Sequence, residues 1–163
     1  MASLRGEIEG RLQQYAARTA CAIERELGFG FDGIVFCTDR QSALKAFRYE
    51  PLYLRERDVY LRLQEHGIVE MSGFKVPRLL GFDDELLVVE MTIVSPPFAL
   101  DFAGAYLDHK PEYPDDVLRE WLTEKLEQFG DRWPEVRLVI AAFARLGIFL
   151  ADVKPGNIEF GDG

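Results

Sequence analysis

The sequence predicts an α+β protein in which a five-stranded antiparallel sheet with one main helix precedes a smaller helical part. Apolar residues follow strand periodicity between about residues 20 and 91, with one helical stripe among them, and follow helical periodicity after about residue 98. The segment between these parts contains two prolines, which predict an extended connector. We therefore expect an amphipathic helix over 1–18, the sheet over 19–94 and the helical part over 95–163.

The composition is that of a folded protein with an acidic surface. The chain has 163 residues, 48% of them hydrophobic, and a net charge of -9, which disfavours nucleic acid and anionic membranes as main partners. No apolar run reaches the roughly 20 residues of a membrane span, and no signal-peptide core is present, so we expect a cytoplasmic protein. The two cysteines, Cys21 and Cys37, and the two histidines, His66 and His109, lack metal-ligand or disulfide spacing.

The first elements are a helix and a glycine-rich turn. Leu4, Ile8, Leu12 and Tyr15 recur at helical spacing. After a strand, glycines in the pattern G-x-G-x-x-G follow over Gly28–Gly33. Such a pattern can open the helix of a dinucleotide-binding turn, or form a hairpin whose backbone amides cover phosphates. Because the next residues continue as a strand, we favour the hairpin, and a hairpin without a ligand remains open.

A lysine and a glutamate stand at positions where apolar residues are expected. Lys45 lies in the apolar strand Ser42–Phe47, and Glu56 lies on the apolar stripe of a helix predicted from Pro51 to His66. Buried charges are costly unless paired, so we expect these two side chains to form an ion pair. An edge-strand lysine and a glutamate that reaches water remain the alternatives.

The later elements are read from the same periodicities. Two strands are predicted over 76–83 and 86–91, a short helix over 98–107, helices over 114–129 and 134–146, and a strand over 158–160.

The segment Asp152-Val-Lys-Pro-Gly-Asn157 follows the last helix and is predicted to be a loop, because Pro-Gly interrupts helices and strands. It holds a carboxylate that can accept a proton, a lysine that can contact a phosphate and an amide oxygen that can bind magnesium. A solvated turn is the alternative for this segment taken alone.

The predicted elements occur in the order seen in eukaryotic-type protein kinases: a glycine hairpin, an Ala-Leu-Lys strand, a glutamate helix, a strand pair, a connector, helices and the Asp-Val-Lys-Pro-Gly-Asn loop. The chain resembles that family over about Ile23–Phe160. The resemblance implies a protein-kinase-like fold with a five-stranded antiparallel N-lobe and a reduced helical C-lobe. It also implies ATP and magnesium as ligands.

The resemblance further implies roles for single residues. The nucleotide contacts would be Gly28, Gly30 and Gly33 on the phosphates, Val35 and Ala43 on the adenine, Lys45 on the α and β phosphates, Glu56 holding Lys45, and the backbone of Glu90 and Thr92 on the base. The catalytic residues would be Asp152 as base, Lys154 on the γ-phosphate and Asn157 as a magnesium ligand.

Two departures from the family pattern shape the expected function. Leu150-Ala151 replaces the His-Arg that precedes the catalytic aspartate, and the sequence stops at Gly163, before the family's Asp-Phe-Gly segment. No substitute for that magnesium-binding aspartate is evident, because Asp162 lies beyond the predicted strand, about 10 Å or more from Asn157.

We expect a kinase-like ATP-binding protein. One hypothesis is an atypical phosphotransferase acting on a protein serine or threonine. The alternative is an inactive pseudokinase or minimal module that binds nucleotide or a partner protein. A resemblance to aminoglycoside or choline kinases, which share Asp-x-x-Pro-x-Asn, also stays open, although Lys154 favours the protein-kinase side.

Overall fold

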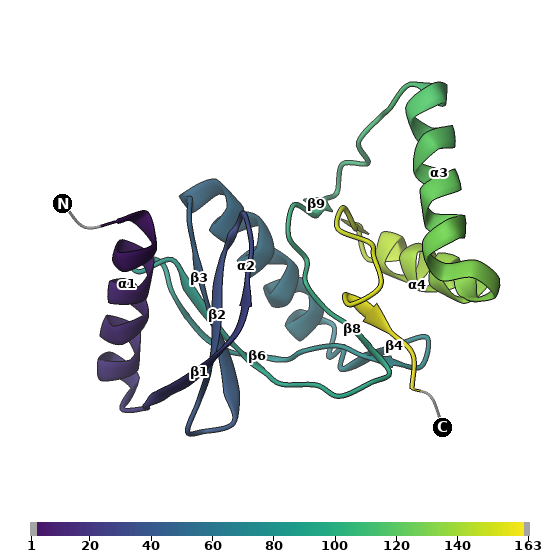
Figure 1. Cartoon of the computed structure of the whole chain (residues 1–163). Helices are drawn as coiled ribbons and strands as arrows, with labels where there is room; N and C mark the ends of the chain where they lie inside the picture. Colours follow the sequence, from purple (N-terminus) through teal and green to yellow (C-terminus); the bar gives the residue numbers. More distant parts are fainter. Residues whose placement is uncertain (1–2, 162–163) are drawn as a thin grey trace.

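The computed structural model describes residues 3–161 as a mixed α+β molecule (Figure 1). Its main sheet is antiparallel and has the strand order β1-β2-β3-β7-β6. The strands are β1 (Ile23–Phe29), β2 (Gly33–Thr38), β3 (Ser42–Phe47), β6 (Leu79–Asp83) and β7 (Val88–Thr92). The predicted five-stranded antiparallel sheet is therefore confirmed.

Two helices cover opposite faces of this sheet. On one face α1 (Leu4–Thr19) packs Leu12 against Leu44 of β3, and on the other α2 (Glu50–Glu65) packs Tyr53 against Phe47. Alternate side chains of a strand point to opposite faces, so β3 serves both cores and all its residues are buried. Full burial of a leucine or phenylalanine side chain contributes roughly 1.5–3 kcal/mol, which fixes the register of β3.

The glycine-rich turn joins β1 to β2 as a hairpin. The Gly30 N–H donates to the Gly33 carbonyl oxygen at 3.0 Å. A Cβ at Gly33 would lie 2.1 Å from the carbonyl oxygen of Ala46, so β3 passes too close for any side chain there. No atom lies within 4 Å of a Cβ built at Gly28, so that glycine is not demanded by packing.

Beyond the main sheet and its two helices, the described chain forms two small sheets and two more helices. A four-stranded sheet has the order β11-β8-β5-β4, and a strand pair joins β10 to β9. These strands are β4 (Glu70–Met71), β5 (Phe74–Lys75), β8 (Phe98–Ala99), β9 (Tyr106–Leu107), β10 (Ile148–Phe149) and β11 (Ile158–Glu159). The helices are α3 (Asp115–Phe129), the 3₁₀ turn η1 (Gly130–Arg132) and α4 (Trp133–Arg145), close to the predicted ranges.

The short helix predicted over 98–107 is wrong. That segment forms β8 and β9 with a turn between them, and both strands pair with β11 and β10 from much later in the chain. In the turn, Asp101 and Gly104 have φ angles of 65° and 71°, which a right-handed helix excludes. Phe102 is 2% exposed and packs edge-on against Tyr60 and Phe143, so long-range packing overrides the local helical pattern.

Within residues 3–161, no helix combines the length and the apolar character that a bilayer crossing requires. Asp162 lies outside the described residues.

Candidate functional site

A cleft of two adjoining cavities lies between the main sheet and the second part of the chain. The inner cavity has a volume of about 320 Å³ and the outer one about 570 Å³. Both are lined by Gly28, Val35, Lys45 and Asp101, so they form one continuous space. A cleft of this kind is the usual place for a small-molecule ligand.

The inner cavity is mostly apolar. Val35 of β2, Ala43 of β3 and Met91 of β7 line its wall. Polar groups reach it from Lys45 and Asn157, on opposite sides of the cleft. An apolar slot with a few polar groups suits a flat heterocycle whose charged substituents extend into the outer cavity.

Lys45 and Glu56 form the predicted ion pair. Lys45 Nζ lies 2.9 Å from Glu56 Oε1, and the two side chains are 6% and 1% exposed. Lys45 projects from the face of β3 that α2 covers, and Glu56 comes from the buried face of α2. The apolar periodicity of both elements thus places the two charges opposite each other.

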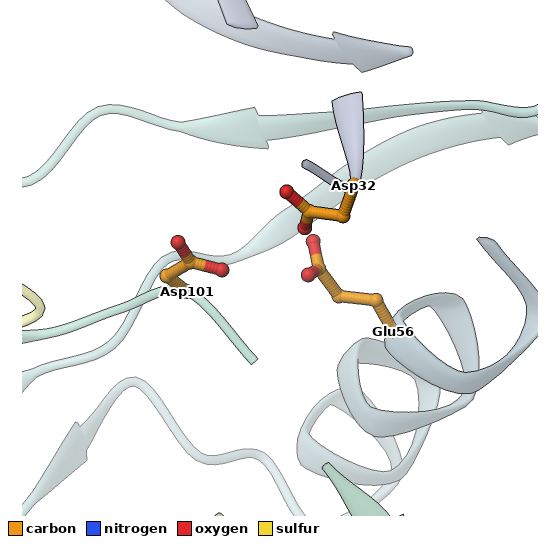
Figure 2. Close-up of side chains that lie close together, drawn as sticks. All are labelled: Asp32, Glu56 and Asp101. Atoms are coloured by element: carbon orange, nitrogen blue, oxygen red, sulfur yellow. The ribbon is translucent and has the colours of Figure 1, made fainter. Parts of the chain in front are cut away.

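Two further carboxylates that sequence reasoning missed contact the same ammonium. Lys45 Nζ lies 2.6 Å from Asp32 Oδ2 and 3.4 Å from Asp101 Oδ1. Figure 2 shows the carboxylates of Asp32, Glu56 and Asp101 pointing toward one another from the glycine turn, from α2 and from the turn after β8. Asp32 sits inside the glycine motif and could have been noticed there, whereas Asp101 was hidden by the wrong helix prediction.

With all three carboxylates ionised, the cluster carries two negative charges in excess of the lysine, and these surroundings shift the pKa values of Glu56 and Lys45. Burial, with smaller contributions from Asp101 and Asp32, raises the pKa of Glu56 to about 7, although Lys45 opposes this shift. Burial alone would lower the pKa of Lys45, but Glu56, Asp101 and Asp32 outweigh burial and raise it well above its usual value. Lys45 therefore stays an ammonium, and the cluster attracts positive charge.

The loop after β10 places its polar residues along the cleft. Asn157 Nδ2 donates to the Asp152 carbonyl oxygen at 2.9 Å and to Asp152 Oδ2 at 3.0 Å. Lys154 Nζ lies 3.6 Å from Asp152 Oδ1, and the buried Val153 anchors the loop. Asn157 lines the inner cavity, while Asp152 and Lys154 line the outer one. Because the amide nitrogen of Asn157 is engaged, its oxygen is the atom available to a cation.

Glu90 and Thr92 are placed differently from the other predicted nucleotide contacts. Glu90, whose backbone was predicted to contact the base, is not among the residues that line the cleft, and its side chain faces α1 and accepts hydrogen bonds from Tyr15, Arg40 and Ser42. Thr92 lines the inner cavity, but its N–H donates to the Arg78 carbonyl oxygen.

The remaining predicted residues do come together in the cleft. They are Gly28, Gly30, Gly33, Val35, Ala43, Lys45, Glu56, Asp152, Lys154 and Asn157. Residues that lie far apart in the sequence therefore share one site.

Comparisons with known proteins give only partial likenesses, all among solved structures. No family model and no curated protein matches the sequence. Among solved structures, the ternary complex of APH(2'')-IIa with streptomycin and ATP aligns with a TM-score of 0.43 and 16% sequence identity. The alignment covers 58% of this chain and 30% of the other, so this chain matches less than a third of that protein's length. An alignment this partial does not assign a fold or a function.

Proposed function

We propose that the chain is a kinase-like protein that binds ATP with magnesium in this cleft and transfers its terminal phosphoryl group. One observation carries the proposal. The buried pair Lys45–Glu56 and the loop residues Asp152, Lys154 and Asn157 line one cleft, beneath a glycine hairpin and next to an apolar slot. Phosphoryl transfer requires this combination of positioning groups, cations and a proton acceptor.

Each group has a role that follows from its position. Lys45 donates to the inner phosphate oxygens, and Glu56 holds its ammonium in place. The amides of the glycine turn approach the phosphates from the other side, which Gly28 permits because it lacks a side chain. Asn157 and Asp101 are the oxygen donors best placed to hold magnesium, whose charge would offset that of the phosphates.

In the transfer step, Asp152 accepts the proton of an acceptor hydroxyl while that oxygen bonds to the γ-phosphorus and the bond to ADP breaks. Lys154, half-exposed at the outer cavity, donates to the oxygens of the phosphoryl group in transit. Lys154 also supports a protein serine or threonine as acceptor, as the sequence prediction has it. A small hydroxylated molecule is the alternative that the open outer cavity allows.

Nucleotide binding without transfer is the second candidate, and the position of Asp32 favours it. Its carboxylate lies 2.6 Å from Lys45 Nζ, where a phosphate oxygen would bind. A chain that keeps this contact with nucleotide bound would hold ATP but transfer slowly.

Calorimetric titration with ATP in the presence and absence of magnesium tests the proposal. We expect magnesium-dependent binding that Lys45→Met weakens by about tenfold or more, because the buried ammonium is lost from the phosphate site. Lys110→Met, which removes an exposed lysine outside the cleft, is the matched control and leaves binding unchanged. Wild-type protein that binds no ATP at millimolar concentration, or a Lys45→Met protein that binds normally, would refute nucleotide binding.

Transfer is tested separately with Asp152→Asn. This variant should bind ATP like the wild type while ADP release with a supplied hydroxyl acceptor falls about 100-fold or more. Equal ADP release by both proteins would leave only the binding function.

A further inference from the structure

The cluster of Asp32, Glu56 and Asp101 has the geometry of a cation site. One carboxylate oxygen from each residue can be chosen so that all three lie within 4.8 Å of one another. Oxygen ligands around one hard divalent cation are separated by about twice the metal–oxygen distance at most, which is roughly 4–5 Å for the range from Mg²⁺ to Ca²⁺. The three side chains therefore need little movement to meet on one ion (Figure 2).

A second observation concerns the buried carboxylate of the same cluster, Glu56. Glu56 is 1% exposed, and its Oε2 has no hydrogen-bond partner among residues 3–161, whereas Oε1 contacts Lys45. A buried carboxylate oxygen without a partner is costly, and a cation bound next to it would remove that cost.

Lys45 occupies only part of the cluster's capacity. It contacts one oxygen of each carboxylate, Glu56 Oε1, Asp32 Oδ2 and Asp101 Oδ1, while Glu56 Oε2 has no hydrogen-bond partner in the described chain. With all three carboxylates ionised, the single ammonium also leaves two negative charges uncompensated. The contact with Asp101 is the longest of the three, at 3.4 Å, so Lys45 holds this carboxylate least closely, and its Oδ1 also accepts from the Ala103 N–H at 3.2 Å.

An ion can reach the cluster from the solvent. The side chains of Asp32 and Asp101 are 19% and 28% exposed, and both line the outer cavity. An ion bound there keeps water on its open side, as magnesium and manganese commonly do.

We propose that Asp32, Glu56 and Asp101 bind a divalent, oxygen-preferring cation in the absence of nucleotide, with Asp101 as the ligand on which its affinity depends most. The catalytic meaning of this site rests on the proposed function, because the ion would enter the cleft before the phosphates. With the cation bound, the protein would accept nucleotide, whereas without it the three carboxylates would repel a triphosphate that carries no metal ion.

Titration with Mn²⁺ alone, followed by the electron paramagnetic resonance signal of free Mn²⁺, tests this site. We expect Asp101→Asn to weaken binding by about tenfold or more. Asparagine tolerates the positive φ of residue 101, so the turn keeps its conformation. Asp116→Asn, an exposed change outside the cleft, serves as control and binds like the wild type.

Lys45→Met separates this proposal from a purely structural role for the cluster. Removal of the neighbouring ammonium should tighten Mn²⁺ binding by about tenfold, while the same change weakens ATP binding. Should Lys45→Met fail to fold, as judged by thermal unfolding, Asp32→Asn replaces it, and weaker Mn²⁺ binding is then expected.

Three results would overturn the site: no Mn²⁺ binding by the wild type at millimolar concentration, equal binding by Asp101→Asn, or weaker binding by a folded Lys45→Met protein. Because ATP is absent, these results leave the test of nucleotide binding untouched. A protein that binds Mn²⁺ as expected but no ATP would keep the cation site and lose the proposed function.

Discussion

The two faces of the main sheet each bury a glutamate, and the two glutamates are treated differently. On the α1 face, Glu90 is 5% exposed and accepts hydrogen bonds from Tyr15 at 3.0 Å, Arg40 at 2.9 Å and Ser42 at 2.6 Å. On the α2 face, Glu56 is 1% exposed, pairs with Lys45 through one oxygen and leaves the other without a hydrogen bond in the described chain.

The difference separates a carboxylate whose hydrogen bonds are complete from one with an unpaired oxygen, which we propose faces a ligand. The donors around Glu90 occupy both of its oxygens, so that face needs nothing more to be stable. Around Glu56 the other charged groups are mainly negative, because Asp32 and Asp101 join it around one ammonium. Unbalanced buried charge of this kind is typical of functional sites, which agrees with the proposed cation site.

The largest expected effect is the loss of stability when Glu90 is replaced, which can be compared with the effect of a substitution at Glu56. Glu90→Ala should lower the free energy of unfolding by about 2–3 kcal/mol, because it leaves buried donors without an acceptor. ATP affinity should stay within about twofold, since Glu90 does not line the cleft. Urea unfolding and calorimetry measure the two quantities.

Glu56→Gln is the matched variant on the other face. This substitution keeps the shape of the side chain. It should lower the free energy of unfolding by about 1 kcal/mol or less and should weaken ATP binding. If Glu90→Ala abolished nucleotide binding without changing the free energy of unfolding, the assignment of a structural role to Glu90 and a binding role to Glu56 would be wrong.

A second contrast concerns two glycines of one turn. Gly33→Ala should destabilise the protein by about 2–3 kcal/mol, because the new methyl group meets the backbone of Ala46. Gly28→Ala should change stability by about 0.5 kcal/mol or less, since its Cβ would meet open space. Chemical denaturation compares them, and equal losses would contradict the close approach at Gly33.

The smallest effect probes one bond of the α1 face. Tyr15→Phe removes the hydrogen bond to Glu90 and should cost about 1 kcal/mol, with no change in ATP affinity. Tyr113→Phe, at an exposed loop position, is the control that should leave the unfolding midpoint in place. A shift in ATP affinity with Tyr15→Phe would show that the two faces are coupled.

Sequence patterns predicted the parts of the site that depend on local periodicity. Lys45 and Glu56 could be paired because each interrupts an apolar stripe, and Asp152 and Asn157 could be grouped because they share one short loop. The five strands followed from the same reasoning.

The parts that depend on register and on distant pairing could not be read in this way. Glu90 faces α1 because it lies opposite Leu44 in the sheet, and only the strand register fixes that. Asp101 lies next to Lys45 because β8 pairs with β11, which comes much later in the chain. The residues around Asp101 contain no local pattern that predicts this pairing.

The pairing of β8 with β11 has a consequence for how the chain can vary. The Leu100 N–H donates to the Asn157 carbonyl oxygen at 2.8 Å, which closes a long excursion of the chain that includes α3 and α4. Closure entropy grows only with the logarithm of length, at about 0.6 kcal/mol for each doubling. Residues can therefore be added or removed in the exposed stretch before α3 at little cost. Asp101 and Asn157 would keep their places while the excursion between them lengthens or shortens.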